Sequence, residues 1–336
     1  MVKAKVWLLV RRPDGLPVPQ DFKLIEEDLP PCGDGDIIIE AEFYSVDPYQ
    51  RYKAREIPLN GPMYGSQVAK VIESKNPSWK VGFYLVCYPG WRSHTHITAK
   101  ELKEGGVVAY TPLPDTAPLP RSVALGVLGM PGNTAYFGFL ELCEPKPGDT
   151  VLVNAAAGAV GSAVVQIAKI KGCKVIASAG TEEKCKWVKE LGADYVFNYK
   201  TSKIGDEIKK AAPNGINCYF DNVAGDFTLE ALPHMATKGR ISLCGAISSY
   251  HEDRSKLVAR SPYDPAIIIS RSLRLEGFMV PNWASRWMEG IKQLKEWLVQ
   301  GKLKYKETVE EGFENIPKAF IGLFTGDNTG KAIVKA

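Results

Sequence analysis

From about residue 150 the chain alternates strand-like apolar segments with amphipathic helical segments, and no other feature constrains its fold as strongly. The first strands are expected at 150–156 and 174–180, followed by helices at 160–171 and 182–191. Further strands are expected at 195–199, 218–223, 239–245 and 273–280, and further helices at 205–212, 226–237 and 286–300. Repeated strand–helix units build a parallel sheet with helices on both faces. We therefore predict an α/β fold in which residues 127–300 form a doubly wound, Rossmann-type domain.

The first third of the chain has a different pattern. Short strand-like segments at 3–10, 37–45, 67–74 and 83–88 are separated by Pro and Gly, which predicts a mainly β domain over residues 1–126. From residue 301 the chain returns to a strand-like pattern that ends in a strand at 331–335. We expect this tail, 301–336, to complete the first domain.

The sharpest local motif is an A-x-x-G-x-x-G turn that follows the strand at 150–156 and opens a helix. Small residues let the backbone turn tightly and approach a pyrophosphate, and Gly161 lets the helix pack close to the strand. The helix amino terminus offers unpaired N–H groups and a positive dipole to phosphate. A glycine pattern alone could be a structural turn. The strand before it, the helix after it and four further strand–helix units favour dinucleotide binding.

The end of the second strand indicates which dinucleotide binds. NAD sites usually place Asp or Glu there to accept from the ribose 2′-hydroxyl. Here the strand ends with Gly180 and Thr181, and Lys184 follows in the first helical turn, where it could meet a 2′-phosphate. Glu182 and Glu183 fit a helix start capped by Thr181. We therefore favour NADPH over NADH, with a solvated surface charge as the alternative role for Lys184.

The pattern of metal-binding residue types argues against zinc. The seven cysteines are dispersed and never form C-x-x-C, and no cysteine lies at ligand spacing to His94 and His96. These two histidines could share one face of a strand, but we expect them in a substrate wall. Without a metal or an evident histidine base, alcohol oxidation lacks its usual proton acceptor. Reduction of a conjugated double bond needs only a donor for the oxygen that becomes negative, such as a tyrosine hydroxyl or a ribose hydroxyl of the cofactor.

Composition excludes several classes of function. The formal net charge is +4, with basic and acidic residues interspersed, so we expect no nucleic-acid partner. No apolar run approaches the roughly 20 residues that span a bilayer, and the first ten residues lack the apolar stretch of a signal peptide. We expect a cytoplasmic protein with reduced thiols and no membrane partner.

Several motifs along the chain carry a family resemblance. They are VDPY at 46–49, GSQVAKV at 65–71, PGW at 89–91, GMPGNTAY at 129–136, the turn at 154–161, FNY at 197–199, YFDNV at 219–223, CGAISSY at 244–250, EGFE at 311–314 and GDN at 326–328. With them the whole chain resembles the zinc-independent medium-chain dehydrogenases/reductases grouped as leukotriene B4 12-hydroxydehydrogenase/15-oxoprostaglandin 13-reductase, or prostaglandin reductases, and the related plant double-bond reductases. The resemblance implies a GroES-like catalytic domain beside the Rossmann domain, NADPH/NADP+ as cofactor, and a homodimer.

The resemblance also implies roles for individual residues. Tyr250 is the donor near the substrate carbonyl, and Tyr49, Arg55 and Tyr64 line the substrate pocket, where Arg55 could meet a carboxylate. The implied cofactor-binding residues are Gly158, Ala159, Val160, Gly161, Lys184, Tyr199, Asn222, Cys244, Gly245, Ala246, Ile247, Ser248, Ser249, Tyr250, Phe278, Met279, Val280 and Asn328.

Each role has an alternative that stays open here. Tyr250 could pack only against the ribose, Tyr49 and Tyr64 could be passive walls, and Arg55 could be solvated. Tyr199 could be an aromatic residue at the edge of the core, and Asn222 a turn residue after its strand.

Departures from the family pattern bear on the substrate. The segment 251–269 is longer than in the mammalian pattern, and Ser270 stands where the family has a tyrosine, with Tyr263 upstream. Eicosanoid preference therefore stays open. We predict an enzyme of EC 1.3.1 class that reduces the carbon–carbon double bond of α,β-unsaturated ketones and aldehydes with NADPH. The alternatives are a zinc-free NADPH quinone reductase and a non-catalytic, crystallin-like NADPH-binding protein.

Overall fold

The structure is a computed structural model that describes residues 2–105, 109–252 and 263–336. The chain forms two compact units, each with its own sheets and core. The first comprises Met1–Gly126 with Glu307–Ala336, and the second Val127–Lys306. The tail segment 301–306, which the sequence assigned to the first domain, groups with the second unit.

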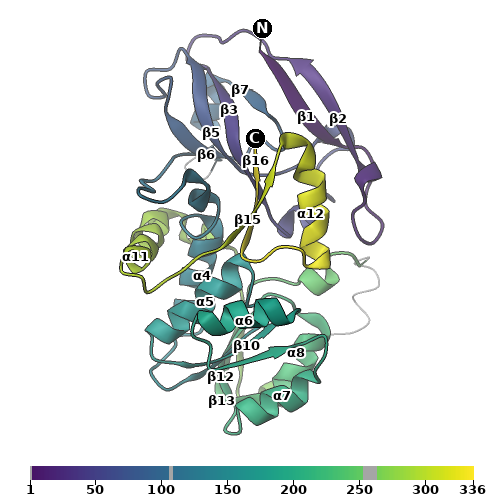
Figure 1. Ribbon diagram of the computed structural model, residues 1–336, viewed down its shortest axis with the longest axis vertical. Coiled ribbons are helices and arrows are strands. Elements are labelled where there is room, and N and C mark those ends of the chain that lie inside the picture. Colours follow the sequence, from purple (N-terminus) through teal and green to yellow (C-terminus); the bar gives the residue numbers. More distant parts are fainter. Residues whose placement is uncertain (1, 106–108, 253–262) are drawn as a thin grey trace. The chain divides into compact units, whose positions relative to one another are not determined.

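A six-stranded parallel sheet is the framework of the second unit (Figure 1). Its strands are β9 (Thr150–Val153), β10 (Lys174–Ala179), β11 (Tyr195–Asn198), β12 (Ile216–Asp221), β13 (Met235–Leu243) and β14 (Arg274–Gly277). They lie in the order β11-β10-β9-β12-β13-β14, and every neighbouring pair is parallel. The strand order reverses between β9 and β12, where doubly wound sheets bind their ligands. The predicted doubly wound parallel sheet is confirmed.

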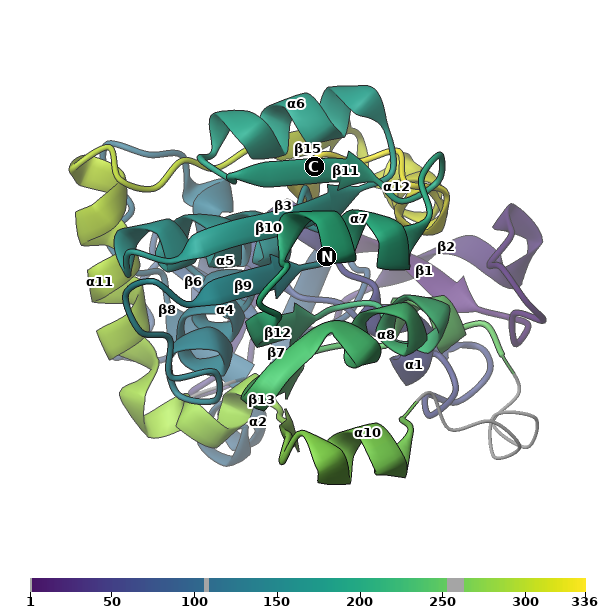
Figure 2. The same cartoon turned by 90° about the horizontal axis from the view of Figure 1, so that it is seen from below.

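Helices cover both faces of this sheet. They are α4 (Met130–Leu140), α5 (Ala159–Ile170), α6 (Glu182–Glu190), α7 (Ile204–Ala211), α8 (Gly225–Ala231), α10 (Pro265–Ser270) and α11 (Trp287–Val299). Figure 2 shows α4, α5 and α11 on one side of the sheet and α7 and α8 together on the other. Right-handed crossovers between parallel strands produce this division.

The core of the second unit follows from the alternation of side chains along its strands. Leu152, Ile176, Tyr219 and Ile241, from four neighbouring strands, are each at most 1% exposed and belong to one cluster. Phe227 of α8 packs against the same cluster. Burial of apolar side chains from both layers holds strands and helices together.

The first unit is built on antiparallel sheets. Its strands are β1 (Lys3–Leu9), β2 (Phe22–Asp28), β3 (Ile37–Val46), β4 (Gly61–Pro62), β5 (Gln67–Ser74), β6 (Tyr84–Cys87), β7 (His94–Ile97), β8 (Tyr110–Pro112), β15 (Glu307–Glu311) and β16 (Lys331–Lys335). One sheet has the order β2-β1-β4, and the other β15-β16-β3-β5-β6-β8 with β7 paired to β3. Strand β16 pairs antiparallel with β3, so the end of the chain completes this unit.

Aromatic side chains fill the core of the first unit. Trp91 lies 5.3 Å from Phe22 and 5.6 Å from Phe320 between ring centroids. Tyr44 lies 5.4 Å from Phe313. Phe320 belongs to α12 (Ile316–Thr325), which the strand-like interpretation of the tail did not predict. Short helices also occur in the first third, α1 (Tyr49–Lys53) and α2 (Ala99–Glu104).

One predicted helix boundary is wrong. The helix expected at 226–237 ends at Ala231, a 3-10 turn covers Leu232–His234, and β13 begins at Met235. The cause is Pro233, because proline supplies no backbone N–H and its ring clashes with the preceding turn.

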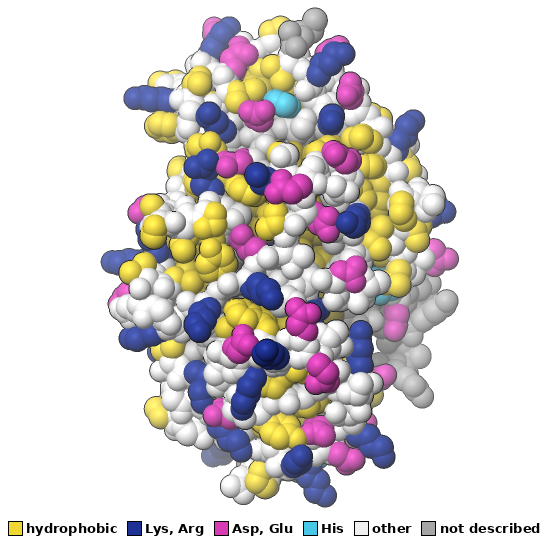
Figure 3. All heavy atoms as spheres, viewed as in Figure 1, with side chains coloured by type: hydrophobic (Ala, Val, Ile, Leu, Met, Phe, Trp, Pro, Cys, Tyr) yellow, Lys and Arg dark blue, Asp and Glu magenta, His cyan; other side chains and the backbone are white. Residues whose placement is uncertain are grey.

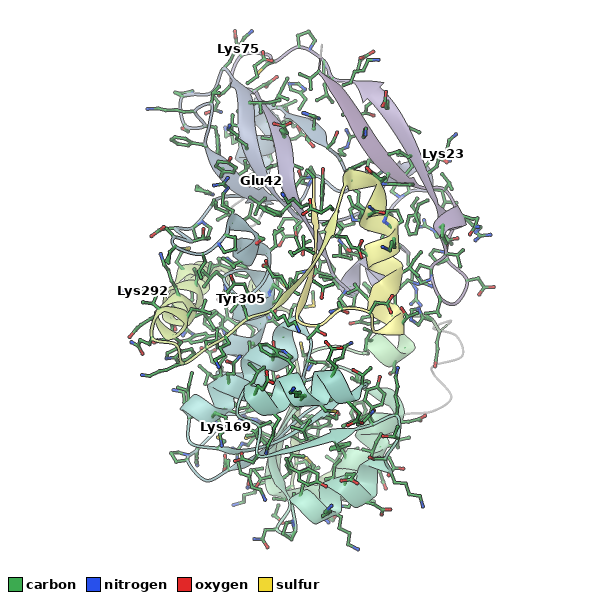
Figure 4. All side chains as sticks on the ribbon, in the orientation of Figure 1. Lys23, Glu42, Lys75, Lys169, Lys292 and Tyr305 are labelled. Carbon is green, nitrogen blue, oxygen red and sulfur yellow. The ribbon has the colours of Figure 1, made fainter. Side chains whose placement is uncertain are left out.

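Charges of both signs are interspersed over the surface shown in Figure 3. Ion pairs join elements within each unit, as two residues labelled in Figure 4 illustrate: Glu42 receives two hydrogen bonds from Arg121 at 2.8 and 3.0 Å, and Lys169 lies 2.8 Å from Asp194. Among the described residues, no helix has the length and apolar character needed to cross a bilayer.

Candidate functional site

The turn between β9 and α5 has the features that a phosphate site requires. The N-cap of α5 is Gly158, which has no side chain to cap the N–H groups of the first helical turn. A Cβ added to Gly161 would lie 2.4 Å from the Ala155 carbonyl oxygen, so only glycine allows this close approach. Ala155 itself has a φ of 45°, in the left-handed region. The turn therefore leaves a compact cradle of N–H donors at a positive helix end.

The end of β10 lies beside α6 and β11. Thr181 caps α6, and its hydroxyl accepts from the Lys184 N–H at 3.2 Å, which places Lys184 in the first turn as predicted. Tyr199, 42% exposed, follows β11. Its hydroxyl lies 3.1 Å from where a Cβ on Gly180 would be, so the ring approaches the backbone at the tip of β10.

A buried polar network joins the carboxyl ends of β9 and β12. One carboxylate oxygen of the fully buried Asp221 accepts from Asn154 Nδ2 at 2.7 Å, from Val223 N at 2.9 Å and from Ala224 N at 2.8 Å. Asn154 Oδ1 accepts from Asn222 N at 2.7 Å, and Asn222 Nδ2 donates to the Asn154 carbonyl at 3.0 Å. The Asn222 side chain thus ties the two strand ends together.

Sequence reasoning did not single out Asn154 or Asp221. Both directly follow apolar residues of a predicted strand, Val153 and Phe220. Polar residues in this position gather at one edge of a parallel sheet, because the carboxyl ends of its strands meet there. That signal was available in the sequence.

The segment after β13 rests on this network. Cys244 N and Gly245 N both donate to the Asp221 carbonyl, at 2.9 and 3.1 Å. Ser248 Oγ donates to the Val223 carbonyl at 2.6 Å. These bonds hold the predicted cofactor segment from Cys244 to Tyr250 along the end of β12.

Tyr250 folds back onto this segment. Its phenolic oxygen accepts from Ala246 N at 3.3 Å. Burial raises the pKa of Tyr250 above its ordinary value, although the hydrogen bond from Ala246 lowers it, so the phenol is neutral at physiological pH. Burial also raises the pKa of the Cys244 thiol to about 12, which keeps it protonated and unreactive.

The residues after β14 face different directions. The Phe278 ring lies 5.6 Å from Trp283, and a Cβ added to Gly138 of α4 would lie 2.2 Å from its Cζ atom. The Phe278 side chain therefore packs toward α4. Only its backbone N–H and carbonyl groups remain to contact a cofactor. Met279 is 68% exposed and Val280 is buried.

The first unit contains a cluster of tyrosines. Tyr49 begins α1, and its ring lies 6.0 Å from Tyr64. Tyr64 in turn lies 6.0 Å from Tyr88. Burial raises the pKa of all three phenols. Tyr88 is not among the predicted site residues, although it directly precedes the PGW motif at 89–91.

Two further predicted residues lie in the first unit. Arg55 is half-buried just after α1, and its N–H donates to the Tyr52 carbonyl at 3.0 Å. Its positive charge lowers the pKa of Arg51, after the larger effect of burial. Asn328 Nδ2 donates to the Gly330 carbonyl at 2.8 Å, in the loop between α12 and β16.

The histidines that could bind a metal are paired with single carboxylates. His96 Nε2 lies 2.8 Å from Asp36 Oδ2, and His94 Nε2 lies 3.5 Å from Glu40 Oε1. In residues 2–105, 109–252 and 263–336, no three His, Cys, Asp or Glu side chains gather in a way that could hold a metal ion. The seven cysteines are free thiols.

Comparison with known proteins identifies the family. The family model described as "N-terminal domain of oxidoreductase" matches residues 5–104, and that described as "Zinc-binding dehydrogenase" matches residues 159–296. The described residues do not supply the ligand set that the second description implies, so no step is assigned to zinc.

Individual relatives match over nearly the whole chain. Prostaglandin reductase 1 of Oryctolagus cuniculus is 47% identical over 334 residues, which cover 99% of this chain and 93% of the relative. The NADP(+)-dependent 2-alkenal reductase of Nicotiana tabacum is 36% identical and covers 90% of this chain and 88% of its own. The structure of CurA in complex with NADPH from Vibrio vulnificus matches with a TM-score of 0.89 and 34% identity over 99% of each chain. The chain therefore belongs to the zinc-independent medium-chain dehydrogenases/reductases that comprise the prostaglandin reductases and alkenal double-bond reductases.

Proposed function

We propose that this protein reduces the carbon–carbon double bond of α,β-unsaturated ketones and aldehydes, with NADPH as the reductant. The observation that carries the proposal is the cradle of N–H donors at the start of α5, with Lys184 in the first turn of α6, in a chain of this family. The cradle requires glycine at 161 and suits a pyrophosphate. The absence of an acidic residue at the tip of β10 suits a 2′-phosphate.

Different segments of the second unit would bind different parts of the cofactor. Gly158 to Gly161 would hold the pyrophosphate, with the N–H groups of Ala159, Val160 and Gly161 as donors, because Gly158 N already donates to the Ala155 carbonyl. Lys184 would hold the 2′-phosphate. Tyr199 and Asn222 would contact the adenosine and ribose side. The segments from Cys244 to Tyr250 and from Phe278 to Val280 would hold the nicotinamide half, and Asn328 of the first unit would contribute as the family resemblance implies. When bound, NADPH supplies a hydride to the β-carbon of the substrate.

The protein side chains would contribute to the reaction by stabilising the carbonyl oxygen of the substrate. As the double bond is reduced, negative charge collects on the carbonyl oxygen, and a fixed neutral donor lowers the energy of that state. Tyr250 fits this role because its phenol stays protonated at physiological pH, and because accepting from Ala246 does not use its own proton. Tyr49, Arg55 and Tyr64 would bind the substrate.

We extend the proposal to the whole protein. The first unit would be the GroES-like catalytic domain and the second the NADPH-binding domain. The protein would be a cytoplasmic homodimer. Free thiols at all seven cysteines support a reducing compartment, and the family resemblance supports the homodimer.

A side-by-side assay tests the reaction. NADPH oxidation is measured with an enone and with a quinone, and the enone product is identified. We expect the saturated ketone and the faster rate with the enone. A quinone rate that is tenfold higher would make the protein a quinone reductase, and tight NADPH binding without turnover would make it a non-catalytic binding protein.

A further inference from the structure

The chain turns sharply at the end of β12, and one carboxylate holds the shape of this turn, residues 221–225. Asp221 accepts from Val223 N at 2.9 Å and from Ala224 N at 2.8 Å. Ala224 and Gly225 have φ values of 58° and 61°, in the left-handed region. Because Asp221 is fully buried, water does not compete for these hydrogen bonds. The 221–225 turn is therefore held in one conformation.

Ser248 joins the segment after β13 to this turn. Its hydroxyl donates to the Val223 carbonyl at 2.6 Å, and its backbone N–H donates to the same carbonyl at 3.3 Å. A serine hydroxyl has one proton, and this hydrogen bond uses it. The family resemblance implies a cofactor contact for Ser248, but its hydroxyl proton is already used within the protein.

Two glycines allow the turn and the segment to approach each other. A Cβ added to Gly225 would lie 2.8 Å from Ser248 Oγ, so any side chain there would push Ser248 away from its carbonyl partner. A Cβ added to Gly245 would lie 3.1 Å from the Asn222 carbonyl oxygen and 3.3 Å from the Tyr250 hydroxyl. The Tyr250 hydroxyl therefore lies against the same contact between turn and segment.

The 3-10 turn Ile247–Ser249 links the position of Ser248 to that of Tyr250. Ser248 is the central residue of this turn, and Tyr250 is its C-cap. Ser249 N donates to the Ala246 carbonyl at 2.9 Å, and Ala246 N donates to the phenolic oxygen of Tyr250 at 3.3 Å. Because these bonds close a short loop around Ser248, a displacement of Ser248 should also displace the Tyr250 hydroxyl.

We propose that Gly225 and Ser248 are positioning residues, which fix the Tyr250 hydroxyl as a hydrogen-bond donor to the carbonyl oxygen of the unsaturated substrate. The missing side chain at Gly225 makes room for Ser248, and the bond from Ser248 to Val223 holds the 3-10 turn against the end of β12. A donor that is fixed in advance stabilises negative charge without reorganisation. This inference rests on the proposed function, because it needs Tyr250 to be that donor.

The first test measures kcat with 4-phenyl-3-buten-2-one and the Kd for NADPH. Ser248→Ala removes one hydrogen bond, so kcat should fall about three- to tenfold. The Kd for NADPH should stay within about twofold, because the hydroxyl does not hold the cofactor. A wild-type kcat would contradict the inference. A loss of NADPH affinity as large as the loss of kcat would also contradict it, because it would make Ser248 a cofactor contact.

The matched control for this variant is Ser242→Ala. The Ser242 hydroxyl donates to the Gly138 carbonyl at 2.8 Å, so the substitution removes the same kind of bond elsewhere in the second unit. It should lower Tm and leave kcat within about twofold of the wild-type value. A loss of kcat equal to that of Ser248→Ala would show that any such bond gives the effect, and would overturn the inference.

A second test uses the contact between Gly225 and Ser248. Gly225→Ala should lower kcat about tenfold, because the added methyl group displaces Ser248. In the Ser248→Ala background it should cause little further loss, since the hydroxyl that it would meet is gone and the Cβ atom at 248 lies at 3.5 Å. The same loss in both backgrounds would contradict the inference.

The control for backbone strain is Gly301→Ala. Gly301 has a φ of 68°, and a Cβ added to it would meet no other atom of the described residues within 4 Å. This variant should lower Tm but leave kcat within about twofold of the wild-type value. A tenfold loss of kcat here would show that strain alone explains Gly225→Ala.

A double-mutant cycle with Tyr250 separates positioning from a structural role. In the Tyr250→Phe background, Ser248→Ala should cause no further loss of kcat, because its effect passes through the Tyr250 hydroxyl. Equal losses in both backgrounds would overturn the inference, as would a Tyr250→Phe variant with wild-type kcat. In those cases the proposed function stands, since the wild type still reduces the enone. If the wild type does not reduce it, the proposed function fails and the inference with it. If Gly225→Ala does not fold, the Ser248 and Tyr250 cycle decides alone.

Discussion

At the scale of single residues, we expect Lys184 to carry the preference for the phosphorylated dinucleotide. Lys184→Ala removes a charge-assisted hydrogen bond, which is equivalent to a loss of about tenfold or more in affinity for NADPH. NADH has no 2′-phosphate, so its Kd should stay within about twofold. Titration of both cofactors measures the difference, with Lys186→Ala, an exposed neighbour on α6, as the control. Equal losses for NADH and NADPH would remove Lys184 from the 2′-phosphate site.

Tyr250 is the residue on which turnover should depend most. Tyr250→Phe removes a donor to the oxygen that becomes negative, and loss of one such donor typically lowers kcat about 100-fold. The Kd for NADPH should change little, because the phenolic oxygen contacts the protein backbone at Ala246. Steady-state kinetics with an enone, together with cofactor titration, provide both values. A wild-type kcat would leave the cofactor's ribose hydroxyl as the donor.

At the scale of elements, the contact between α5 and the turn that follows β9 sets the shape of the cradle. A Cβ at position 161 would lie 2.4 Å from the Ala155 carbonyl oxygen, whereas one at position 158 would lie 3.3 Å from it. Gly161→Ala should therefore push α5 away and weaken NADPH binding more than tenfold, or about 1.4 kcal/mol. Gly158→Ala should weaken it less. Similar Kd values for both variants would show that the helix does not need this close approach.

A second element-scale prediction concerns the start of β15. Ser122 Oγ donates to Glu307 Oε2 at 2.8 Å, and Glu307 Oε1 is buried without a hydrogen-bond partner in the part of the chain that the structure describes. Burial raises the pKa of Glu307 above its ordinary value, and Ser122 and Lys331 lower it in part. Between the unfolded pKa, about 4.3, and the raised folded pKa, the folded state binds more protons than the unfolded state.

Stability contributed by the protonated Glu307 is therefore present at low pH and lost as the pH rises through this window. In Glu307→Gln this loss should vanish, so that Tm changes less with pH above about pH 4 than in the wild type. Calorimetry over a pH series measures the slope, with Glu26→Gln, an exposed residue of β2, as the control. Parallel curves for Glu307→Gln and the wild type would contradict the assigned shift.

At the scale of the whole molecule, sequence periodicity predicts the parallel sheet well and the long-range tertiary contacts poorly. Strands β9 to β12 lie close to their expected positions, because a buried parallel strand shows as a continuous apolar run. Helix α12 was missed, although Phe320 on it is buried against Trp91 from a distant part of the chain. Local pattern alone does not reveal such long-range packing.

The candidate site likewise combines local features, which the sequence shows, with contacts between distant segments, which it does not show. The turn from Gly158 to Gly161 and the cap at Thr181 are local features, and the sequence shows them directly. The buried Asp221 carboxylate takes its partners from Asn154 just after β9, from its own turn and from α8. Pairings of this kind require the three-dimensional arrangement.

The position to which hydride is delivered is the most direct test of the proposed reaction. The protein is incubated with NADPH that carries deuterium at the transferable position of the nicotinamide ring and with 4-phenyl-3-buten-2-one, and the product is analysed by mass spectrometry and NMR. We predict one deuterium on the former β-carbon of a saturated ketone. Deuterium on the carbinol carbon of an allylic alcohol would contradict reduction of the double bond.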